Sequence, residues 1–290
     1  MKLLLPRLAA FLLLVCCQLF ATVHAQTMVR LHTTQGLIDM KMLDGAPITV
    51  ANFLQYLREG HYNDGVVHRN AWSTTTIPFV IQAGGWRWTP TQLFAIPTRP
   101  PIVNEFSASR SNLRRTVAMA KSPSGPNTAT SQWFINLWDN QFLDSQNGGF
   151  TVFARVTLPG MVTADRISRL PQVDLRPQVP WDSMPVQNWT SGFVNREHAV
   201  LITEARELPN ATETDRILNF LEAHFTQHLQ PSKGIPGTYQ GYNFRYYSTS
   251  NAYVASKEGS VYYLVPAISN EIRYLATVAE LLEVAAHFGY

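Results

Sequence analysis

The chain has 290 residues, of which 46% are hydrophobic and 15% charged, and its formal net charge is +3 at pH 7. This composition excludes a disordered chain, and the small excess of positive charge argues against a strong attraction to nucleic acid or to an anionic membrane surface. The length suits one large domain, or one medium-sized domain and one small one.

The first 25 residues have the pattern of a secretory signal peptide. Lys2 and Arg7 stand near an apolar run, and Val23-His24-Ala25 precedes Gln26 as a cleavage site does. The run is shorter than the ~20 residues that a bilayer span needs. We therefore expect an exported, periplasmic protein that begins at Gln26 and has no membrane span after cleavage.

Removal of this leader changes the chemistry that is available. Lys2 and Arg7 are two of the 23 basic residues, so 21 basic residues remain against 20 acidic ones. Cys16 and Cys17 are the only cysteines of the chain, and both lie in the leader. The remaining chain is expected to have no disulfide, no cysteine metal site and no thiol nucleophile.

The elements from residue 28 to residue 208 are mainly short strands. Residues 28–34 and 37–43 alternate in character around Gln35-Gly36, which predicts a hairpin. Apolar residues at helical spacing predict a helix over 49–57, capped by Thr49, and a second helix is expected over 160–170. Further strands are expected at 79–82, 116–121, 132–137, 150–156 and 199–206. Many strands with two helices predict a closed or nearly closed barrel whose ends the helices cover.

The pattern changes after Pro209. Residues 212–215 resemble a capping box ahead of a helix over 216–225, two or three strands are expected between 242 and 265, and a last helix is expected from Glu271 to His287. We therefore divide the chain into a signal peptide (1–25), a first domain (26–209) and a small tyrosine-rich α+β module (210–290).

Seven motifs in the first domain follow one another in a characteristic order. They are Val67-His-Arg69, Pro78-Phe-Val-Ile-Gln82, Asn104-Glu-Phe106, Arg115-Thr-Val-Ala-Met-Ala-Lys121, Asn127-Thr-Ala-Thr-Ser-Gln-Trp-Phe-Ile-Asn136, Phe142-Leu-Asp144 and Gly149-Phe-Thr-Val-Phe-Ala-Arg-Val156. In this order and spacing they resemble the cyclophilin family of peptidyl-prolyl cis–trans isomerases, particularly its exported bacterial members. The resemblance covers roughly residues 28 to 208.

The resemblance implies a mainly β fold, an eight-stranded antiparallel β-barrel capped by two helices, here followed by the small C-terminal α+β module. It also implies a substrate groove on the outer face of the barrel, and partners that are proline-containing unfolded or extended polypeptides. The reaction is rotation about an X-Pro bond, whose barrier is ~18–20 kcal/mol. No bond is exchanged, so we expect no cofactor and no metal, and we expect a monomer.

The resemblance also implies the site residues. Arg69 is the expected catalytic residue, because its permanent charge and rigid donors can bond the lone pair that the prolyl nitrogen gains only in the twisted state. The expected substrate-binding residues are Phe79, Val80 and Phe134 for the proline ring, Phe142 at the rim, Gln82 and Gln132 as positioning amides, Ala120 in a neighbouring subsite, the backbone of Lys121 for a substrate carbonyl, and Phe150 where eukaryotic members have a histidine.

Some positions depart from the family pattern. Residues 70–78 form a longer connection than is usual between the arginine motif and Phe79. The aromatic residues Phe142 and Phe150 imply weak cyclosporin binding.

The longer connection keeps a second hypothesis for the function open, in which the barrel binds proline-containing segments or acts as a chaperone without catalysis. In a third hypothesis the C-terminal module is the functional part.

Other residues have two interpretations. His224 and His228 have the i, i+4 spacing of a metal pair, but without a third ligand we favour two partly exposed helix residues. His68 is expected to be structural, because isomerisation needs no proton transfer. The aromatic residues of the module could stack on a glycan or an extended peptide, although we favour core packing with some rings facing out. They are Tyr239, Tyr242, Phe244, Tyr246, Tyr247, Tyr253, Tyr262 and Tyr263.

Overall fold

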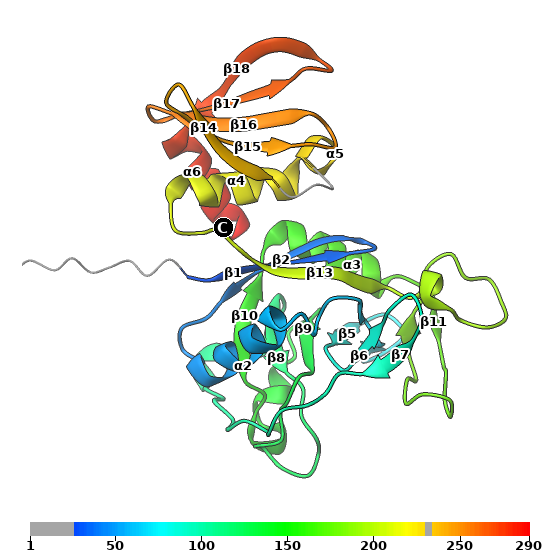
Figure 1. Cartoon of the computed structure of the whole chain (residues 1–290). Helices are drawn as coiled ribbons and strands as arrows, with labels where there is room; N and C mark the ends of the chain where they lie inside the picture. The colour runs from blue at the N-terminus through cyan, green and yellow to red at the C-terminus, as the bar shows by residue number, and fades with distance from the viewer. Residues whose placement is uncertain (1–25, 230–233) are drawn as a thin grey trace, which may run out of the picture.

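A computed structural model describes residues 26–229 and 234–290, so the predicted signal peptide lies outside the described part of the chain. The larger part of the protein is one antiparallel sheet of strands in the order β4-β5-β9-β8-β10-β2-β1-β13-β3-β6-β7 (Figure 1). The strands are β1 (Met28–Thr33), β2 (Gly36–Met42), β3 (Gly65–Val66), β4 (Arg69–Trp72), β5 (Pro78–Ala83), β6 (Trp86–Trp88), β7 (Leu93–Ala95), β8 (Thr116–Met119), β9 (Trp133–Asn136), β10 (Val152–Val156) and β13 (Leu201–Leu208).

The segment from Gly65 to Trp72 closes this sheet into a barrel. Its first part, β3, pairs with β13, and its second part, β4, pairs with β5, so one chain segment bonds to both ends of the curled sheet. Eight barrel strands result when β3 and β4 are counted as one and the β6–β7 hairpin is set apart. The barrel that the sequence predicts is therefore confirmed.

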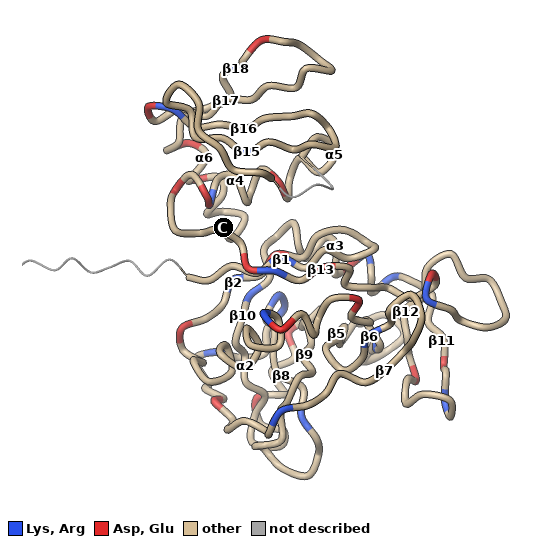
Figure 2. The backbone as a smooth tube through the Cα atoms, in the orientation of Figure 1, with Lys and Arg blue, Asp and Glu red and all other residues tan. Residues whose placement is uncertain are grey.

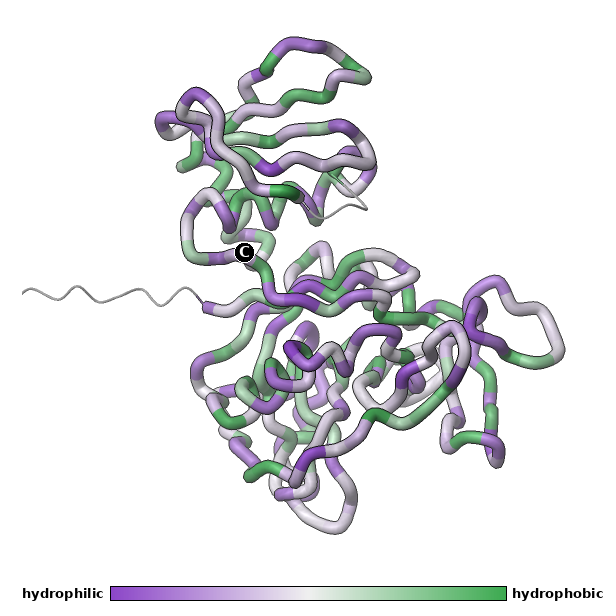
Figure 3. Tube along the Cα trace, viewed as in Figure 1, coloured by the Kyte–Doolittle hydropathy of each residue, from purple (hydrophilic) through white to green (hydrophobic). Residues whose placement is uncertain are grey.

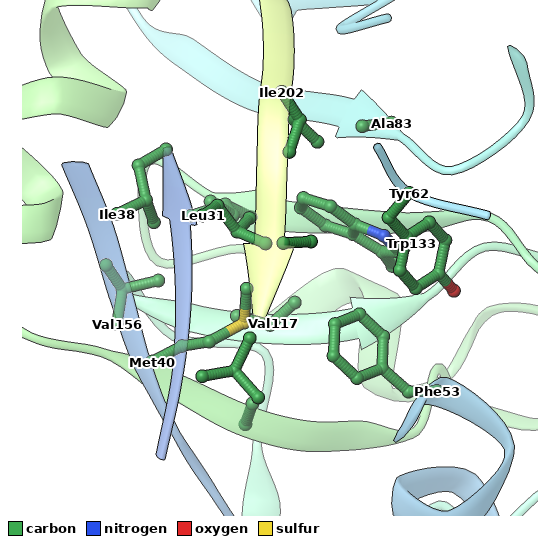
Figure 4. Close-up of a cluster of buried hydrophobic side chains, with 14 of the residues drawn as sticks. Leu31, Ile38, Met40, Phe53, Tyr62, Ala83, Val117, Trp133, Val156 and Ile202 are labelled. Carbon is green, nitrogen blue, oxygen red and sulfur yellow. The ribbon is translucent and has the colours of Figure 1, made fainter. Parts of the chain in front are cut away.

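Two helices pack against the barrel core. The helix α2 (Pro47–Arg58) contributes Phe53, and α3 (Leu158–Ser168) contributes Met161. Figure 4 shows Phe53, Tyr62 and Trp133 grouped beside the inward-facing residues of the strands. Because strand side chains alternate between faces, the core takes one residue in two from each strand and leaves the other outside.

The start of α2 differs from the prediction. Pro47 is its first residue and Ala46 its N-cap, so Thr49 lies inside the first turn. The Thr49 hydroxyl instead bonds Glu105 at 2.7 Å, and the same carboxylate accepts from the backbone N–H of Thr49. The carboxylate of Glu105, from a distant loop, therefore caps this helix by accepting from the free N–H groups of its first turn. Pro47 suits the first helical position because it has no N–H group to satisfy.

The C-terminal module consists of the elements after β13. A five-stranded antiparallel meander carries two helices, α4 and α6, on one face, while the short helix α5 follows α4 (Figure 1). Figure 3 shows hydrophobic segments in both longer helices, which share a core with the sheet. The elements are α4 (Glu213–His224), α5 (Thr226–Leu229), β14 (Ile235–Tyr239), β15 (Tyr242–Tyr247), β16 (Ala252–Lys257), β17 (Ser260–Val265), β18 (Ser269–Thr277) and α6 (Val278–Phe288). Between α3 and β13 along the chain, β11 (Gln172–Val173) and β12 (Met184–Pro185) form a small two-stranded sheet beside the barrel.

The prediction of a helix from Glu271 was wrong. Residues 269–277 form strand β18, and the helix begins only at Val278. Thr277 and Glu280 form a capping box that fixes this start, because each side chain accepts from the other's backbone N–H. Upstream of Thr277, pairing with β17 decides the conformation in favour of a strand.

A buried ionic network joins the module to the barrel. Arg30 of β1 bonds both carboxylate oxygens of Asp39 at 2.7 Å, and it also donates to Glu222 of α4 and to the backbone carbonyl of Asn219. Glu222 accepts in addition from Arg245 at 3.0 Å. Arg30 is wholly buried, so these carboxylates replace the water that its charge has lost.

Candidate functional site

A row of side chains crosses the outer face of the barrel. Strand pairing places Arg69 opposite Gln82, Gln82 opposite Phe134, and Phe134 opposite Ala118. Directly paired residues share a face of the sheet, and neighbouring strands lie about 4.8 Å apart. The interior residues Ile81 and Ile135 alternate with this row, so Arg69, Gln82 and Phe134 point outward together.

Two amides connect the arginine to the rest of the site. Arg69 Nη1 lies 3.4 Å from Gln82 Oε1, and Gln82 Nε2 donates to Gln132 Oε1 at 2.8 Å. Gln132 lies flat against the chain at Gly85, where an added Cβ would come within 2.9 Å of its Cδ. Because Gly85 has no side chain, the Gln132 amide has room to reach Gln82.

An apolar cluster adjoins this chain of polar groups. Phe134 is 5% exposed and Val80 2%, and Phe79, Ala120 and Phe150 pack partly buried against them. The pairing of β4 with β5 shifts at Ala71/Trp72, which leaves Phe79 as an extra residue on β5. A bulge of this kind aims two successive side chains at one face, which explains why Phe79 and Val80 join the same cluster.

Aromatic rings form the edge of the cluster. Phe142 is 47% exposed, and its ring centroid lies 5.5 Å from that of Phe79. Phe150 packs edge-to-face on Phe134 at 5.7 Å, and the Lys121 ammonium lies 4.8 Å above the Phe150 ring. Lys121 Nζ also donates to two backbone carbonyls, at Asn147 and Gly149. The structure thus brings together all ten residues that the sequence assigns to the site.

Further apolar residues complete the cluster without having been predicted. Ala71, Ala118, Leu143 and Val152 are buried members of the cluster, and Leu43 packs partly buried against them. Leu143 follows Phe142 in a short 3₁₀ turn over Gln141–Asp144. The Phe142-Leu-Asp144 motif was the only signal in the sequence that pointed to it.

A buried polar network behind the cluster holds two of its aromatic residues. Asn140 Nδ2 donates to the backbone carbonyl of Phe79 at 3.0 Å and to Asn136 Oδ1 at 2.8 Å. Asp144 accepts from the backbone and the side chain of Asn112, which fixes the turn that carries Phe142. These residues position the cluster, and sequence reasoning missed them because the partners lie up to 61 residues apart.

The long connection between Arg69 and Phe79 is a β-hairpin. Residues 69–72 and 78–83 pair as β4 and β5, and the exposed loop between them is closed by a bond from Ser73 N–H to the Ile77 carbonyl. The additional residues therefore lengthen the hairpin away from Arg69. They leave Arg69 in register with Gln82.

The His68 side chain lies behind the candidate site, within reach of the Gln132 side chain. It is buried, and its ring lies 6.2 Å from that of Trp181. Burial lowers the pKa of His68 to about 4, so the imidazole is neutral in ordinary working conditions. A buried neutral ring beside Arg69 matches the expectation of a structural histidine.

The two histidines with metal-pair spacing lie on different helices in the structure. His224 ends α4 and packs on Phe220 and Phe288, whereas His228 lies in α5 beyond the break at Phe225. Within residues 26–229 and 234–290, no group of three His, Cys, Asp or Glu side chains is arranged to hold a metal ion.

Acidic and basic residues are interspersed over the surface of the barrel in Figure 2. Among the described helices, none has the length and apolarity of a bilayer span.

Comparison with known proteins identifies the family of the barrel. Residues 28–190 match the family model described as cyclophilin type peptidyl-prolyl cis-trans isomerase/CLD. The chain therefore belongs to the cyclophilin-type peptidyl-prolyl cis–trans isomerase family. It is an enzyme of that reaction class, a peptidyl-prolyl cis–trans isomerase.

Two bacterial relatives show the extent of the similarity. A peptidyl-prolyl cis-trans isomerase of Acinetobacter baylyi is 39% identical over 151 residues, which cover 51% of this chain and 74% of the relative. Peptidyl-prolyl cis-trans isomerase B of Escherichia coli is 42% identical over 146 residues, which cover 48% of this chain and 83% of the relative. A solved cyclophilin-type structure from Cryptosporidium parvum matches with a TM-score of 0.46 at 20% identity, covering 64% of this chain and 99% of that chain.

Proposed function

We propose that the protein accelerates rotation of X-Pro bonds in exported proteins, and that Arg69 is the catalytic residue. The observation that carries this proposal is the row Arg69–Gln82–Phe134 on the outer face. The apolar cluster around Phe134 binds the proline ring, and the guanidinium lies two strands away, roughly 10 Å between backbones. A side chain as long as arginine spans that gap to the nitrogen of a seated proline.

Catalysis follows from the difference between the planar and the twisted bond. In the planar amide the prolyl nitrogen shares its lone pair with the carbonyl and accepts no hydrogen bond. In the twisted state the lone pair is localised, and Arg69 donates to it. This bond exists only near the transition state, so it lowers the barrier rather than tightening substrate binding. Gln82 and Gln132 restrict where the guanidinium lies.

The pH dependence distinguishes this mechanism from acid–base catalysis. Arginine stays protonated at every working pH, and His68, with its pKa lowered to about 4 by burial, stays neutral above pH 5. We expect kcat/KM for an X-Pro tetrapeptide to be constant from pH 5.5 to pH 8.5. The measurement is the rate at constant ionic strength across that range. An inflection near pH 6.5 that disappears in His68→Gln would instead identify histidine as a proton-transfer group.

We also propose export to the periplasm, with residues 1–25 removed. The support is the leader pattern of basic residues, apolar run and small residue before Gln26. Expression of the full chain in a Gram-negative host should give a periplasmic protein whose N-terminal residue is Gln26. Recovery of the chain from the cytosol with Met1 in place would contradict export.

A further inference from the structure

The sheet of the C-terminal module has one face that no helix covers. Its members follow from strand alternation and ring contacts. Tyr242 contacts Tyr262 at 5.5 Å, and Tyr262 contacts Tyr274 at 6.0 Å. Phe244 and Tyr246 both contact Tyr253, at 5.8 Å and 4.6 Å. We call this set the aromatic face, and it consists of Tyr239, Tyr242, Phe244, Tyr246, Tyr253, Tyr262, Ile272 and Tyr274.

The interpretation that these rings fill a core is wrong for most of them. Only Tyr247 is buried, where it donates to Glu222 on the helix side of the sheet. Tyr263 pairs with the buried Val254 and therefore points to that side as well. By contrast, Tyr239 is 66% exposed and Tyr274 55%. The core of the module lies between the sheet and the helices α4 and α6, and the rings of the aromatic face lie outside it.

The aromatic face is hollowed rather than flat. A cavity of about 410 Å³ lies over it, lined among others by Tyr239, Tyr242, Tyr262 and Ile272. This volume is within the range of known ligand sites, ≈ 300–1,000 Å³. The rings of Tyr242 and Tyr262 meet edge-to-face at 82°, and both line this cavity. Glycine at Gly237 lets the Phe244 ring lie against strand β14, since an added Cβ would come within 2.5 Å of it.

The lining of the cavity limits the chemistry of its occupant. Every lining residue is Thr, Tyr, Phe, Ala, Leu or Ile, so no carboxylate, amide or guanidinium side chain faces the space. A neighbouring cation, Lys257, lies 4.8 Å above the Tyr242 ring. A nucleic acid needs several cations to neutralise its phosphates, whereas the residues that line this cavity carry none.

We propose that the aromatic face is a second binding site, and that its ligand is a proline-containing extended segment of the polypeptide that the barrel isomerises. Such a segment has apolar pyrrolidine rings, lacks N–H donors at proline, and holds a preformed extended helix that loses little entropy on binding. Aromatic-lined grooves with tyrosine hydroxyls are the surfaces that bind it. The proposal rests on the proposed function, since the barrel supplies the reason for proline-containing clients.

A second site on the same chain changes how clients are held. A client with two separated prolines can occupy the aromatic face while another proline enters the barrel site. The second contact is then intramolecular, which raises overall affinity without new contacts at the catalytic site. A short peptide with one proline occupies one site at a time and therefore gains no affinity from the second site. The aromatic face therefore predicts a preference for long clients.

The test titrates residues 26–290, labelled with ¹⁵N, with blocked decaproline and, separately, with a blocked (Gly-Ser)₅ peptide and chitotetraose. We expect decaproline to shift the amide signals of β15, β17 and β18, with no effect of the other two probes. Tyr239→Ser, which alters a mostly exposed ring and leaves the core intact, should weaken binding at least tenfold. Tyr262→Ser is the second variant, and Phe193→Ser, at a 98% exposed aromatic outside the module, is the control that should bind as the native protein does.

Three results would overturn the site: decaproline leaves the module signals unchanged, it binds Tyr239→Ser and Tyr262→Ser as tightly as native protein, or chitotetraose shifts those signals instead. Turnover of a single-proline tetrapeptide should be unchanged in Tyr239→Ser. This readout separates the two proposals. Normal turnover without decaproline binding removes only the second site, whereas decaproline binding without any turnover removes only the catalytic proposal.

Discussion

Arg69→Ala should lower kcat/KM for an X-Pro tetrapeptide by about 10²- to 10³-fold, the loss that follows removal of one preorganised donor to a developing charge. Because the guanidinium bonds the nitrogen only in the twisted state, KM should change little and kcat should carry the loss. Arg69→Lys should recover only part of the rate, since a flexible point charge replaces a rigid fork. The measurement is steady-state kinetics of peptide isomerisation.

The matched control is Arg155→Ala. Arg155 lies on barrel strand β10, it is exposed, and it stands outside the row that contains Gln82 and Phe134. Its replacement removes the same charge from the same barrel and should leave kcat/KM within about twofold of native. An equal loss in both variants would mean that general electrostatics, rather than a bond at the prolyl nitrogen, accounts for the effect.

The largest effect on stability is expected from Arg30→Met. Asp39 and Glu222 are both buried, and the substitution removes a cation that bonds both of them. Breaking a buried pair by removing one partner costs about 3–5 kcal/mol in the free energy of unfolding, because a charge is left uncompensated. Calorimetric unfolding should therefore show a lower midpoint, and the module should be the part that loosens from the barrel.

The control for this experiment is the exposed ion pair between Arg58 and Glu207, at 2.7 Å. Arg58→Ala should cost less than about 1 kcal/mol, as is usual for surface pairs. A loss in Arg30→Met as small as that in Arg58→Ala would show that the network does not hold the module. Acid should weaken the same network. Burial alone would raise the pKa of Glu222, but the charges of Arg30 and Arg245 lower it below its usual value. The ionised Glu222 therefore contributes to the free energy of unfolding above the usual glutamate pKa. This contribution is lost as the pH falls through the lowered pKa.

Local patterns in the sequence predicted a closed or nearly closed barrel but not the segment that closes it. Alternating runs placed most barrel strands within a few residues of their observed positions, and the motifs supplied the residues of the candidate site. That Gly65–Trp72 pairs with β13 at one end and β5 at the other depends on contacts between distant segments, which no local pattern encodes. The same reason applies to Arg30 and Glu222, which are 192 residues apart.

The sequence motifs supply the residues of the candidate site but not the groups that support them. Arg69, Phe79 and Phe134 sit inside recognisable motifs, and the structure places them on one face. The bulge that turns Phe79 toward Val80 comes from a shift in strand register, and Asn140 acts through the backbone of Phe79. In the module, residue type favoured a core role for the tyrosines, but α4 and α6 fill the core and leave the aromatic face open.

The most direct test of the central claim is NMR exchange spectroscopy on a peptide with one X-Pro bond, with native protein and with Arg69→Ala. Native protein should produce exchange cross-peaks between the cis and trans signals, and Arg69→Ala should abolish them while the peptide signals still shift on binding. Equal cross-peaks with both proteins would contradict the role of Arg69. Binding without cross-peaks in the native protein would contradict catalysis and make the barrel a binding module.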